Sequence, residues 1–445
     1  MGDEKHPSSK LSEILRPGKL LHRRRRLVSE FADVGREDAL HESDTVKYRV
    51  FAGTWNVAGV APPDDLDLGD WLDAKADSYD IYVLALQEIV PLNARNVLGP
   101  TRSSAAMKWN SLIGDALNRF TTGRRRRDDD DDGDDDEGAQ RHGQQQQPFR
   151  CVVSEQMVGI FVSVWARSGL RRHVRHVAAS CVGAGVLGRL GNKVRRAYLS
   201  QQWRAAARAA RLDSGMAALQ GAVSVRFLLH GTSFCFVCCH LASGGKDGDA
   251  QLRNADAADI LSRTTFRRRT TAAASPAPEE LPLPRKILDH DRVVLLGDLN
   301  YRIAMDDAEA RLLVRAGKWS MLLENDELLL ELAEGGSFDG WREGLVTFSP
   351  TYKYHLNSDM FYWSIDAAAG GGDKQQQRAP AWCDRILWRG KGMRQASYER
   401  CGGYRISDHR PVRAVFDAVC ELAGGGVGVE HSAAGIASFG HVPLL

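Results

Sequence analysis

Apolar and polar residues alternate in several short stretches of the chain, with the period of two that is typical of β-strands. Val46, Tyr48 and Val50 alternate with polar residues and lead into Phe51-Ala-Gly-Thr-Trp-Asn, which predicts a strand ending at Asn56. The run Tyr79-Asp-Ile-Tyr-Val-Leu-Ala-Leu-Gln-Glu is apolar on both alternate faces, as in a strand buried on both sides. Both predicted strands therefore end in polar side chains.

Strand-like runs outnumber helix-like runs further along the chain. Strands are predicted in two pieces over 151–164, in a hairpin formed by 223–229 and 234–241, and at 293–296, 384–388 and 412–416. Helical periodicity occurs over 250–261 and 321–332. This order, with many antiparallel neighbours, favours a mixed α/β fold of the α+β type: a four-layer sandwich of two packed, mixed, largely antiparallel sheets flanked by helices.

Polar segments interrupt this pattern and bound the folded part. Residues 1–44 are polar and basic, with the run Arg23–Arg26, which favours a disordered tail over a membrane-surface or nuclear-import patch. Residues 123–147 and 267–284 have the composition of disordered loops. We therefore predict one folded domain over 45–420, followed by a C-terminal tail at 421–445.

Charge and hydropathy limit the classes of partner and of cellular location. The formal net charge of the 445 residues is +2, which is too small to indicate nucleic acid or membrane binding by itself. No apolar run approaches the roughly 18 residues of a membrane span, and the first residues are too charged for a secretory signal. We expect an intracellular, cytoplasmic protein, with a nuclear location left open.

The eight cysteines are scattered and are expected to be free thiols. Cys235 and Cys238 have the spacing of a zinc or redox pair. No second ligand pair stands at the usual distance, and neighbouring side chains of a strand point to opposite faces. Buried free cysteines are the favoured interpretation.

Five short segments place polar or charged residues at the end of an apolar strand, where a scaffold can hold them rigidly. They are Thr54-Trp-Asn-Val, Leu86-Gln-Glu, Cys239-His-Leu, Gly297-Asp-Leu-Asn-Tyr-Arg and Ser407-Asp-His-Arg-Pro-Val. Taken singly, a strand-end Gln-Glu pair is usually a surface group and a lone histidine is usually structural. Taken together, the five segments indicate a shared site.

In this order, the five segments resemble the inositol polyphosphate 5-phosphatase family of the endonuclease/exonuclease/phosphatase superfamily. The resemblance extends over 51–416 and includes Phe348-Ser-Pro-Thr-Tyr-Lys-Tyr and Arg378-Ala-Pro-Ala-Trp-Cys-Asp-Arg-Ile-Leu-Trp, two strings that separate these phosphatases from nucleases of the same fold. The context Gln87-Glu-Ile-Val-Pro-Leu-Asn-Ala resembles plant members of type I. The resemblance implies a deoxyribonuclease I-like fold.

The activity that the resemblance implies is Mg²⁺-dependent removal of the 5-phosphate. The substrates would be phosphoinositides such as phosphatidylinositol 4,5-bisphosphate, soluble inositol polyphosphates such as inositol 1,4,5-trisphosphate, or both. A nuclease of the same fold is an alternative. Another is a catalytically impaired phosphoinositide-binding protein. We expect no nucleic-acid partner, transient peripheral contact with a membrane, and a monomer.

Phosphate monoester hydrolysis needs a Lewis acid, an oriented water, and donors where negative charge develops. Glu88 offers the hard carboxylate oxygen that Mg²⁺ prefers. By resemblance, Asn56 lies beside it and helps to order metal and phosphate. The resemblance also implies that Asp298 orients and deprotonates the attacking water, while Asn300 holds phosphate.

The second half of the implied catalytic set surrounds an imidazole. His409 would be the charged donor to the phosphoryl group, with Asp384 and Asp408 keeping it oriented and protonated, and His240 would add a further donor. A strand-end salt bridge between Asp384 and Arg385 is the alternative for that carboxylate.

Substrate choice is implied by the Pro-Thr-Tyr-Lys-Tyr string. In the family its Tyr and Lys contact the 4-phosphate of the inositol ring, which here means Tyr352 and Lys353, and Arg378 is expected to be a third contact. A point charge together with a phenol suits a neighbouring phosphate. The alternative for Tyr352 is a core aromatic beside Tyr354.

Two departures from the family pattern stand out. Residues 194–220, rich in Arg, Ala and Gln, separate Gly191-Asn-Lys from Gly221-Ala-Val-Ser-Val, which are usually almost adjacent. We hypothesise that 194–220 translate a retained intron or a gene-model error, although a surface loop of this length costs little free energy. Leu241-Ala-Ser-Gly also lacks the further histidine of many animal relatives, so only His240 is carried over.

Overall fold

The computed structural model describes residues 45–73, 79–91, 104–128, 148–184, 220–246, 248–267, 283–362 and 379–422. Several predictions lie wholly or mostly outside these ranges: the tails at 1–44 and 421–445, the loops at 123–147 and 267–284, the segment 194–220, and the contact Arg378. The described strands begin at Thr45 and end at Glu421. In the described part, no helix is long and apolar enough to cross a membrane.

In the described part of the chain, twelve strands form two sheets of six. Sheet A, in spatial order, contains β11 (Met393–Arg400), β12 (Val412–Glu421), β1 (Thr45–Asn56), β2 (Ile81–Gln87), β4 (Ile160–Arg167) and β3 (Phe149–Met157). Sheet B contains β5 (Val174–Gly183), β6 (Gly221–Leu229), β7 (Thr232–His240), β8 (Arg292–Asp298), β10 (Asp384–Arg389) and β9 (Arg342–Glu343). One pair in each sheet is parallel, β1 with β2 and β7 with β8, and the other pairs are antiparallel.

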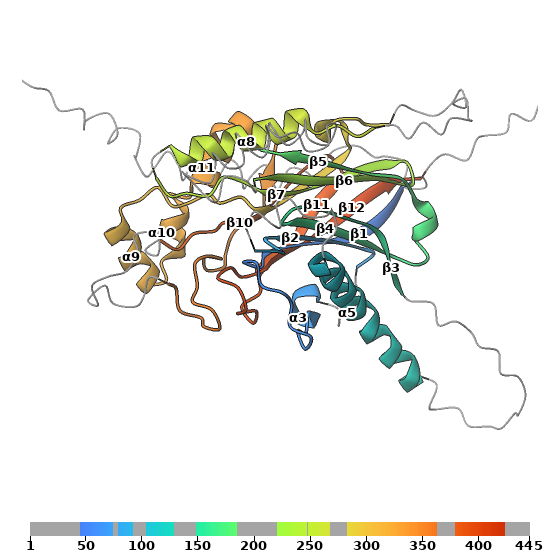
Figure 1. Cartoon of the computed structure of the whole chain (residues 1–445). Coiled ribbons are helices and arrows are strands. Elements are labelled where there is room, and N and C mark those ends of the chain that lie inside the picture. Colours follow the sequence, from blue (N-terminus) through green and yellow to red (C-terminus); the bar gives the residue numbers. More distant parts are fainter. Residues whose placement is uncertain are drawn as a thin grey trace, which may run out of the picture.

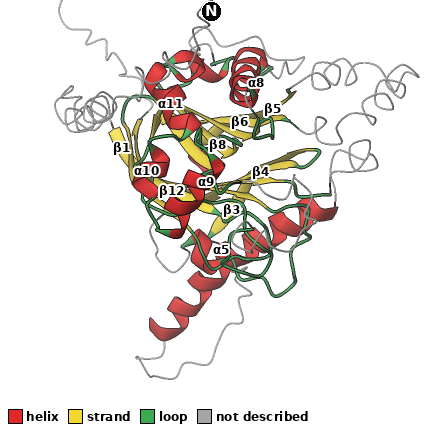
Figure 2. Ribbon diagram, turned by 90° about the vertical axis from the view of Figure 1, so that its left-hand side faces the viewer, coloured by secondary structure: helices red, strands yellow, loops and turns green. Residues whose placement is uncertain are grey.

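Helices cover the outer faces of both sheets, as Figures 1 and 2 show. These helices are α3 (Gly69–Leu72), α5 (Ser104–Asp128), α8 (Asp249–Arg263) and α11 (Glu327–Glu334). Two further helices, α9 (Asp307–Arg315) and α10 (Trp319–Leu323), lie at one end of the sheets and pack against the core between them. Single turns of 3₁₀-helix occur at Arg171–His173, Ile287–Asp289 and Gly336–Phe338. Helices α3 and α5 lie on sheet A, and α8 and α11 lie on sheet B.

Alternation along the central strands explains the layers. In β1, Val50 and Ala52 face the core between the sheets, while Phe51 and Trp55 face outward and pack with Trp109 of α5. β7 divides its residues in the same way between the core and α8. Because both faces of these strands are covered, they are apolar on both sides. The predicted four-layer sandwich of two mixed sheets is confirmed.

The structure corrects some predicted elements. The single helix expected over 321–332 is two helices, α10 and α11, because the Asp326 side chain caps α11 by accepting a hydrogen bond from the Leu329 N–H. α5 continues to Asp128, beyond residue 123 where we predicted a loop to begin. Strands β5, β9 and β11 and helices α3, α5 and α9 were not predicted.

Candidate active site

The carboxyl ends of the two parallel strand pairs bring the predicted residues together. In sheet A, Asn56 at the end of β1 is opposite Gln87, which precedes Glu88. In sheet B, His240 at the end of β7 is opposite Asp298 at the end of β8. Since parallel strands end at the same edge, each pair presents its polar residues side by side.

The Asn56 amide joins the two sheets at this edge. Its Nδ2 donates to Glu88 Oε1 at 3.0 Å and to Asp298 Oδ2 at 2.9 Å. Its Oδ1 accepts from the backbone N–H of Ala58 at 2.9 Å, which fixes the orientation because a backbone N–H can only donate. Asn56 therefore presents a donor, not a free oxygen, to the two carboxylates. Its predicted part in metal binding would have to use the second lone pair of Oδ1.

Asp298 is buried among donors and cations. His240 Nε2 lies 3.5 Å and His409 Nε2 lies 3.8 Å from Asp298 Oδ2, and the backbone N–H of Asn300 donates to Oδ1 at 3.1 Å. Burial alone would raise the pKa of this carboxyl, but the two imidazoles and the Asn56 amide hold the pKa of Asp298 below its usual value. Asp298 is therefore an ionised carboxylate at neutral pH.

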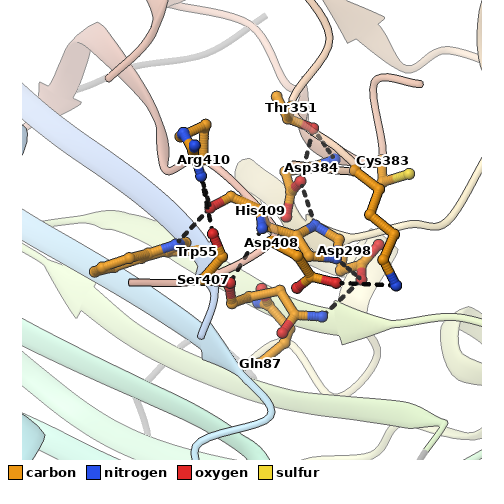
Figure 3. Close-up of polar contacts among 12 residues, drawn as sticks. Trp55, Gln87, Asp298, Thr351, Cys383, Asp384, Ser407, Asp408, His409 and Arg410 are labelled. Atoms are coloured by element: carbon orange, nitrogen blue, oxygen red, sulfur yellow. Dashed lines mark hydrogen bonds and ion pairs between the residues drawn. The ribbon is translucent and has the colours of Figure 1, made fainter. Parts of the chain in front are cut away.

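His409 is held in place by Asp384, as Figure 3 shows. The Nδ1 of His409 lies 2.8 Å from Asp384 Oδ2, and the same oxygen accepts from Thr351 Oγ1 at 2.7 Å. Burial opposes the charge on the imidazole, but Asp384 and Asp298 overcome it and raise the pKa of His409 to about 10. An imidazolium therefore presents its Nε2–H toward Asp298.

Asp384 does not form the alternative salt bridge with Arg385. The Arg385 guanidinium instead pairs with Asp326 at 2.8 Å and with Glu343 at 2.6 Å, all of them buried. The Asp384 carboxylate is thus available to His409.

The Asp408 carboxylate contacts Lys353, whereas we predicted that it would orient the His409 imidazole. Its carboxylate lies 3.5 Å from the Lys353 ammonium, the one ion pair found for Asp408 among the described residues. Lys353 also lies over the rings of Tyr352 and Tyr362, with its Nζ 5.7 Å and 5.0 Å from the two centroids. Asp408 therefore positions the lysine of the predicted 4-phosphate contact, and its effect on His409 is through charge alone.

Tyr352 is both buried and part of the site. Its ring centroid lies 4.4 Å from that of His409, and 5% of the residue is exposed. The two interpretations of Tyr352, a core aromatic and a site residue, are therefore compatible.

Three residues that we did not predict hold the site together. The Ser407 hydroxyl donates to the Asn56 carbonyl at 2.7 Å, and Trp55 Nε1 donates to the His409 carbonyl at 3.2 Å. Thr351 donates to Asp384, as described above. Each of them is adjacent in sequence to a predicted site residue, but the contact that each makes is with a residue far away in the chain.

A divalent cation fits the chemistry on the Glu88 side. The carboxylates of Glu88 and Asp298 both accept from the single Nδ2 of Asn56, and 24% of the Glu88 side chain is exposed. Two close carboxylates of this kind favour a hard cation. Asp298, Asp384 and His409 also have metal-ligand spacing, but Nδ1 of His409 is bonded to Asp384 and its ring is protonated, so these three form an ion-pair cluster.

Most of the predicted site residues meet at this edge. They are Asn56, Glu88, His240, Asp298, Asn300, Asp384 and His409, with Tyr352, Lys353 and Asp408 beside them. Arg378 lies outside the described residues. The cysteines are free, and Cys235 and Cys238 face different hydrophobic cores, which excludes a shared metal.

Comparisons with known proteins agree with this geometry. The model of the Endonuclease/Exonuclease/phosphatase family 2 matches residues 53–415. The chain is 46% identical to type IV inositol polyphosphate 5-phosphatase 9 of Arabidopsis thaliana, over 84% of this chain and 79% of the relative. It is 40% identical to type I inositol polyphosphate 5-phosphatase 8 of the same plant, over 87% and 74%.

A solved structure is similar over most of the fold. It is the inositol polyphosphate 5-phosphatase domain of SPsynaptojanin in complex with inositol (1,4)-bisphosphate and calcium ion. The two chains are 26% identical, with a TM-score of 0.61, over 85% of this chain and 87% of that one.

Proposed function

The chain belongs to the inositol polyphosphate 5-phosphatase family, and from this we propose that it is a Mg²⁺-dependent phosphomonoesterase that removes the 5-phosphate of an inositol ring. Phosphatidylinositol 4,5-bisphosphate and inositol 1,4,5-trisphosphate present the same ring phosphates and are the proposed substrates. The similar solved domain holds inositol (1,4)-bisphosphate, which is the trisphosphate without its 5-phosphate.

The observation that carries this proposal is the pairing of an ionised carboxylate with an imidazolium. Asp298 Oδ2 lies 3.8 Å from His409 Nε2, and each keeps the other charged. Asp298 would accept a proton from the attacking water, while His409 would donate to a phosphoryl oxygen as negative charge develops there. Asn300 and His240 lie next to Asp298 and would bind the remaining phosphoryl oxygens.

Glu88 would hold the metal ion, with Asn56 beside it. When bound, Mg²⁺ supplies positive charge that stabilises the phosphoryl oxygens. The two carboxylates at this point would otherwise repel a phosphate, and the cation would offset that repulsion. The other residues orient the substrate and move the proton.

Selectivity for the 5-position would come from the neighbouring 4-phosphate. Lys353 offers a charge and Tyr352 a phenol at the edge of the catalytic cluster, with Asp408 limiting the movement of the lysine. Arg378 remains a proposed third contact. A bound 4-phosphate would place the adjacent 5-phosphate against Asp298 and His409.

Phosphate release tests the proposal. The chain is incubated with inositol 1,4,5-trisphosphate or with phosphatidylinositol 4,5-bisphosphate in vesicles, in Mg²⁺ and in EDTA, and with a supercoiled plasmid. We expect phosphate release from an inositol substrate that EDTA abolishes, and no nicking of the plasmid. Nicking without phosphate release would instead favour the nuclease alternative.

The proposed location and membrane contact follow from the substrate. A lipid substrate would require transient contact of a cytoplasmic protein with a membrane, and vesicle sedimentation together with fluorescence microscopy of the tagged chain tests both. The catalytically impaired alternative depends on residues 194–220, of which only Gln220 lies in the described part. Binding of inositol phosphate without release, in chains with and without 194–220, would support that alternative. Release only by the shortened chain would identify the segment as the cause.

A further inference from the structure

Arg302 is a buried cation beside the catalytic cluster that the proposed mechanism does not use. It follows β8 by four residues, and 7% of it is exposed. No carboxylate of the described residues lies within ion-pair distance of its guanidinium, and its Nη1 is buried without a hydrogen-bond partner there. Two fully buried arginines of the described residues, Arg253 and Arg385, pair with Glu or Asp, whereas the buried Arg226, like Arg302, donates to a backbone carbonyl. Burial disfavours the charge, but the surrounding groups, Asp298 among them, keep the pKa of Arg302 above its usual value, so the contacts of the guanidinium indicate its role.

The guanidinium fixes the amide of Asn300. Nη2 of Arg302 donates to Asn300 Oδ1 at 2.7 Å, and Nε donates to the Gly244 carbonyl at 3.1 Å. Because arginine has no acceptor, the Asn300 atom that faces it must be the oxygen. The amide nitrogen then points away and donates one hydrogen to the Leu241 carbonyl at 3.2 Å, which leaves its second N–H for a ligand.

The same guanidinium also contacts the other phosphate subsite. Its central carbon lies 4.7 Å from the centroid of the Tyr352 ring, which also lies against the His409 ring. A planar guanidinium can stack its face on a ring and donate from its edge in a fixed fork at the same time. Arg302 is thus in contact with Asn300 on one side and with Tyr352 on the other.

We propose that Arg302 is a positioning residue that holds the Asn300 amide as a phosphate donor and keeps the Tyr352 ring in register with it. The inference rests on the proposed function, because it assigns the two subsites to the 5- and 4-phosphates. Arg302 acts through these two residues and does not itself contact the substrate. It makes cleavage at the first subsite depend on occupation of the second.

A double-mutant cycle with two substrates tests this role. The variants are Arg302→Lys, Asn300→Ala and the double variant, each assayed for kcat and KM on inositol 1,4,5-trisphosphate and on inositol 1,5-bisphosphate, which lacks the 4-phosphate. The matched control is Arg226→Lys, a buried arginine that stacks on Phe266 and donates to the Pro284 carbonyl away from the site. Thermal unfolding of every variant monitors folding.

We expect Arg302→Lys to lose on the order of 100-fold in kcat/KM on the trisphosphate, because displaced groups cost about that much. Its preference for the trisphosphate over the bisphosphate should fall toward one. In the Asn300→Ala background the same change should add little to the loss in kcat, since its effect on catalysis passes through Asn300. The Arg226→Lys control should keep the wild-type kinetics.

Two results together would overturn the inference and leave Arg302 a structural residue. In the first, the kcat losses of Arg302→Lys and Asn300→Ala multiply in the double variant. In the second, Arg302→Lys keeps the preference of the unaltered chain for the substrate with a 4-phosphate. If the unaltered chain releases no phosphate, the proposed function fails. The cycle is then measured on the dissociation constant of inositol 1,4,5-trisphosphate by calorimetry, where the same coupling is expected. Absence of both turnover and binding would overturn the inference as well.

Discussion

At the residue scale, the charge of His409 depends on the carboxylates that face it. Asp384 accepts from its Nδ1 and Asp298 lies near its Nε2, and together they raise the pKa of His409 to about 10. A raised pKa means that the imidazolium is present throughout the neutral range and is lost as pH rises through about 10. Activity that needs this donor should therefore fall only on the strongly alkaline side.

The Asp384→Asn variant tests that dependence. An amide removes one negative charge, so the pKa of His409 should fall and the alkaline limb of kcat/KM should move by about one to two pH units to lower pH. The control is Asp417→Asn, a carboxylate that pairs with Lys47 and Arg394 at the surface. An alkaline limb that stays in place in Asp384→Asn would show that another group donates to the phosphoryl oxygen.

The positions of the catalytic residues were predictable because the residues stand at strand ends in recognisable segments. Their orientation was not. The Asn56 amide is fixed by the Ala58 N–H, and Asp408 is drawn to Lys353, contacts that depend on the backbone path around the site. Thr351 and Ser407 were missed for the same reason, since a hydroxyl in a motif gives no sign of the distant atom that it contacts.

At the scale of elements, the site depends on the close approach of β7 and β8. Gly297 precedes Asp298 with a φ of +148°, and a Cβ at this position would lie 2.0 Å from the Cys239 carbonyl oxygen. A side chain would therefore push the two strands apart where His240 and Asp298 meet. Glycine is required here by both backbone conformation and space.

We expect Gly297→Ala to lower the free energy of unfolding by about 1–3 kcal/mol or more, since overpacking in a rigid core is rarely relaxed. The midpoint of urea denaturation measures it. Gly169→Ala is the control, because its Cβ would meet nothing within 4 Å. Equal midpoints for the two variants would show that β7 and β8 can separate without cost.

The break between α10 and α11 depends on Asp326. Its carboxylate caps α11 at the Leu329 N–H and also accepts two hydrogen bonds from Arg385 Nη1, at 2.8 Å and 2.9 Å. β10, which carries Asp384, is thereby attached to the helical layer. Apolar residues on both sides of Asp326 predicted one continuous helix. The pattern gives no sign of the break, because Arg385, which binds the capping carboxylate of Asp326, lies 59 residues away in the sequence.

Asp326→Asn keeps a good helix cap but removes the charge that Arg385 needs. We expect a loss of about 3–5 kcal/mol, as when one partner of a buried ion pair is removed. Asp306→Asn is the matched control, since Asp306 caps α9 at the Ala308 and Glu309 N–H groups and is exposed. Chemical denaturation compares the free energies of unfolding of the two variants. A similar small decrease in both would show that Asp326 acts only as a helix cap.

The unpredicted strands have a common physical cause. β5, β9 and β11 are edge strands; β9 has only two residues, and most residues of β5 and β11 are only partly buried or exposed. Without a clear apolar face, alternation is weak and pairing with a neighbour decides the structure. The central strands were predicted close to their observed ends, except β12, which continues to Glu421, beyond the predicted end at 416.

At the scale of the whole molecule, the site lies across both sheets. Asn56 and Glu88 come from sheet A, whereas His240, Asp298 and Asp384 come from sheet B. The segment before β12 joins the two sheets, because Ser407 and the His409 carbonyl bond to β1 of sheet A and the His409 ring bonds to Asp384 of sheet B. A ligand bound at this edge should therefore stabilise the domain as one unit.

Calorimetric unfolding tests whether the two sheets unfold as one cooperative unit. With Mg²⁺ and inositol 1,4-bisphosphate at 100 times its dissociation constant, we expect a single transition, stabilised by about 2.7 kcal/mol. The Asp417→Asn variant should respond equally, because it lies away from the site. Two transitions, only one of which moves with ligand, would mean that the sheets unfold separately.

The most direct test of the central claim is kcat for phosphate release from inositol 1,4,5-trisphosphate by the Asp298→Asn variant, compared with the unaltered chain and with Asp417→Asn. An amide keeps the size of the side chain but cannot accept the proton of water. We predict a loss of about 10²–10⁴-fold for Asp298→Asn, typical of a general base, and none for the control. Activity of Asp298→Asn within a few-fold of the unaltered chain would contradict the account.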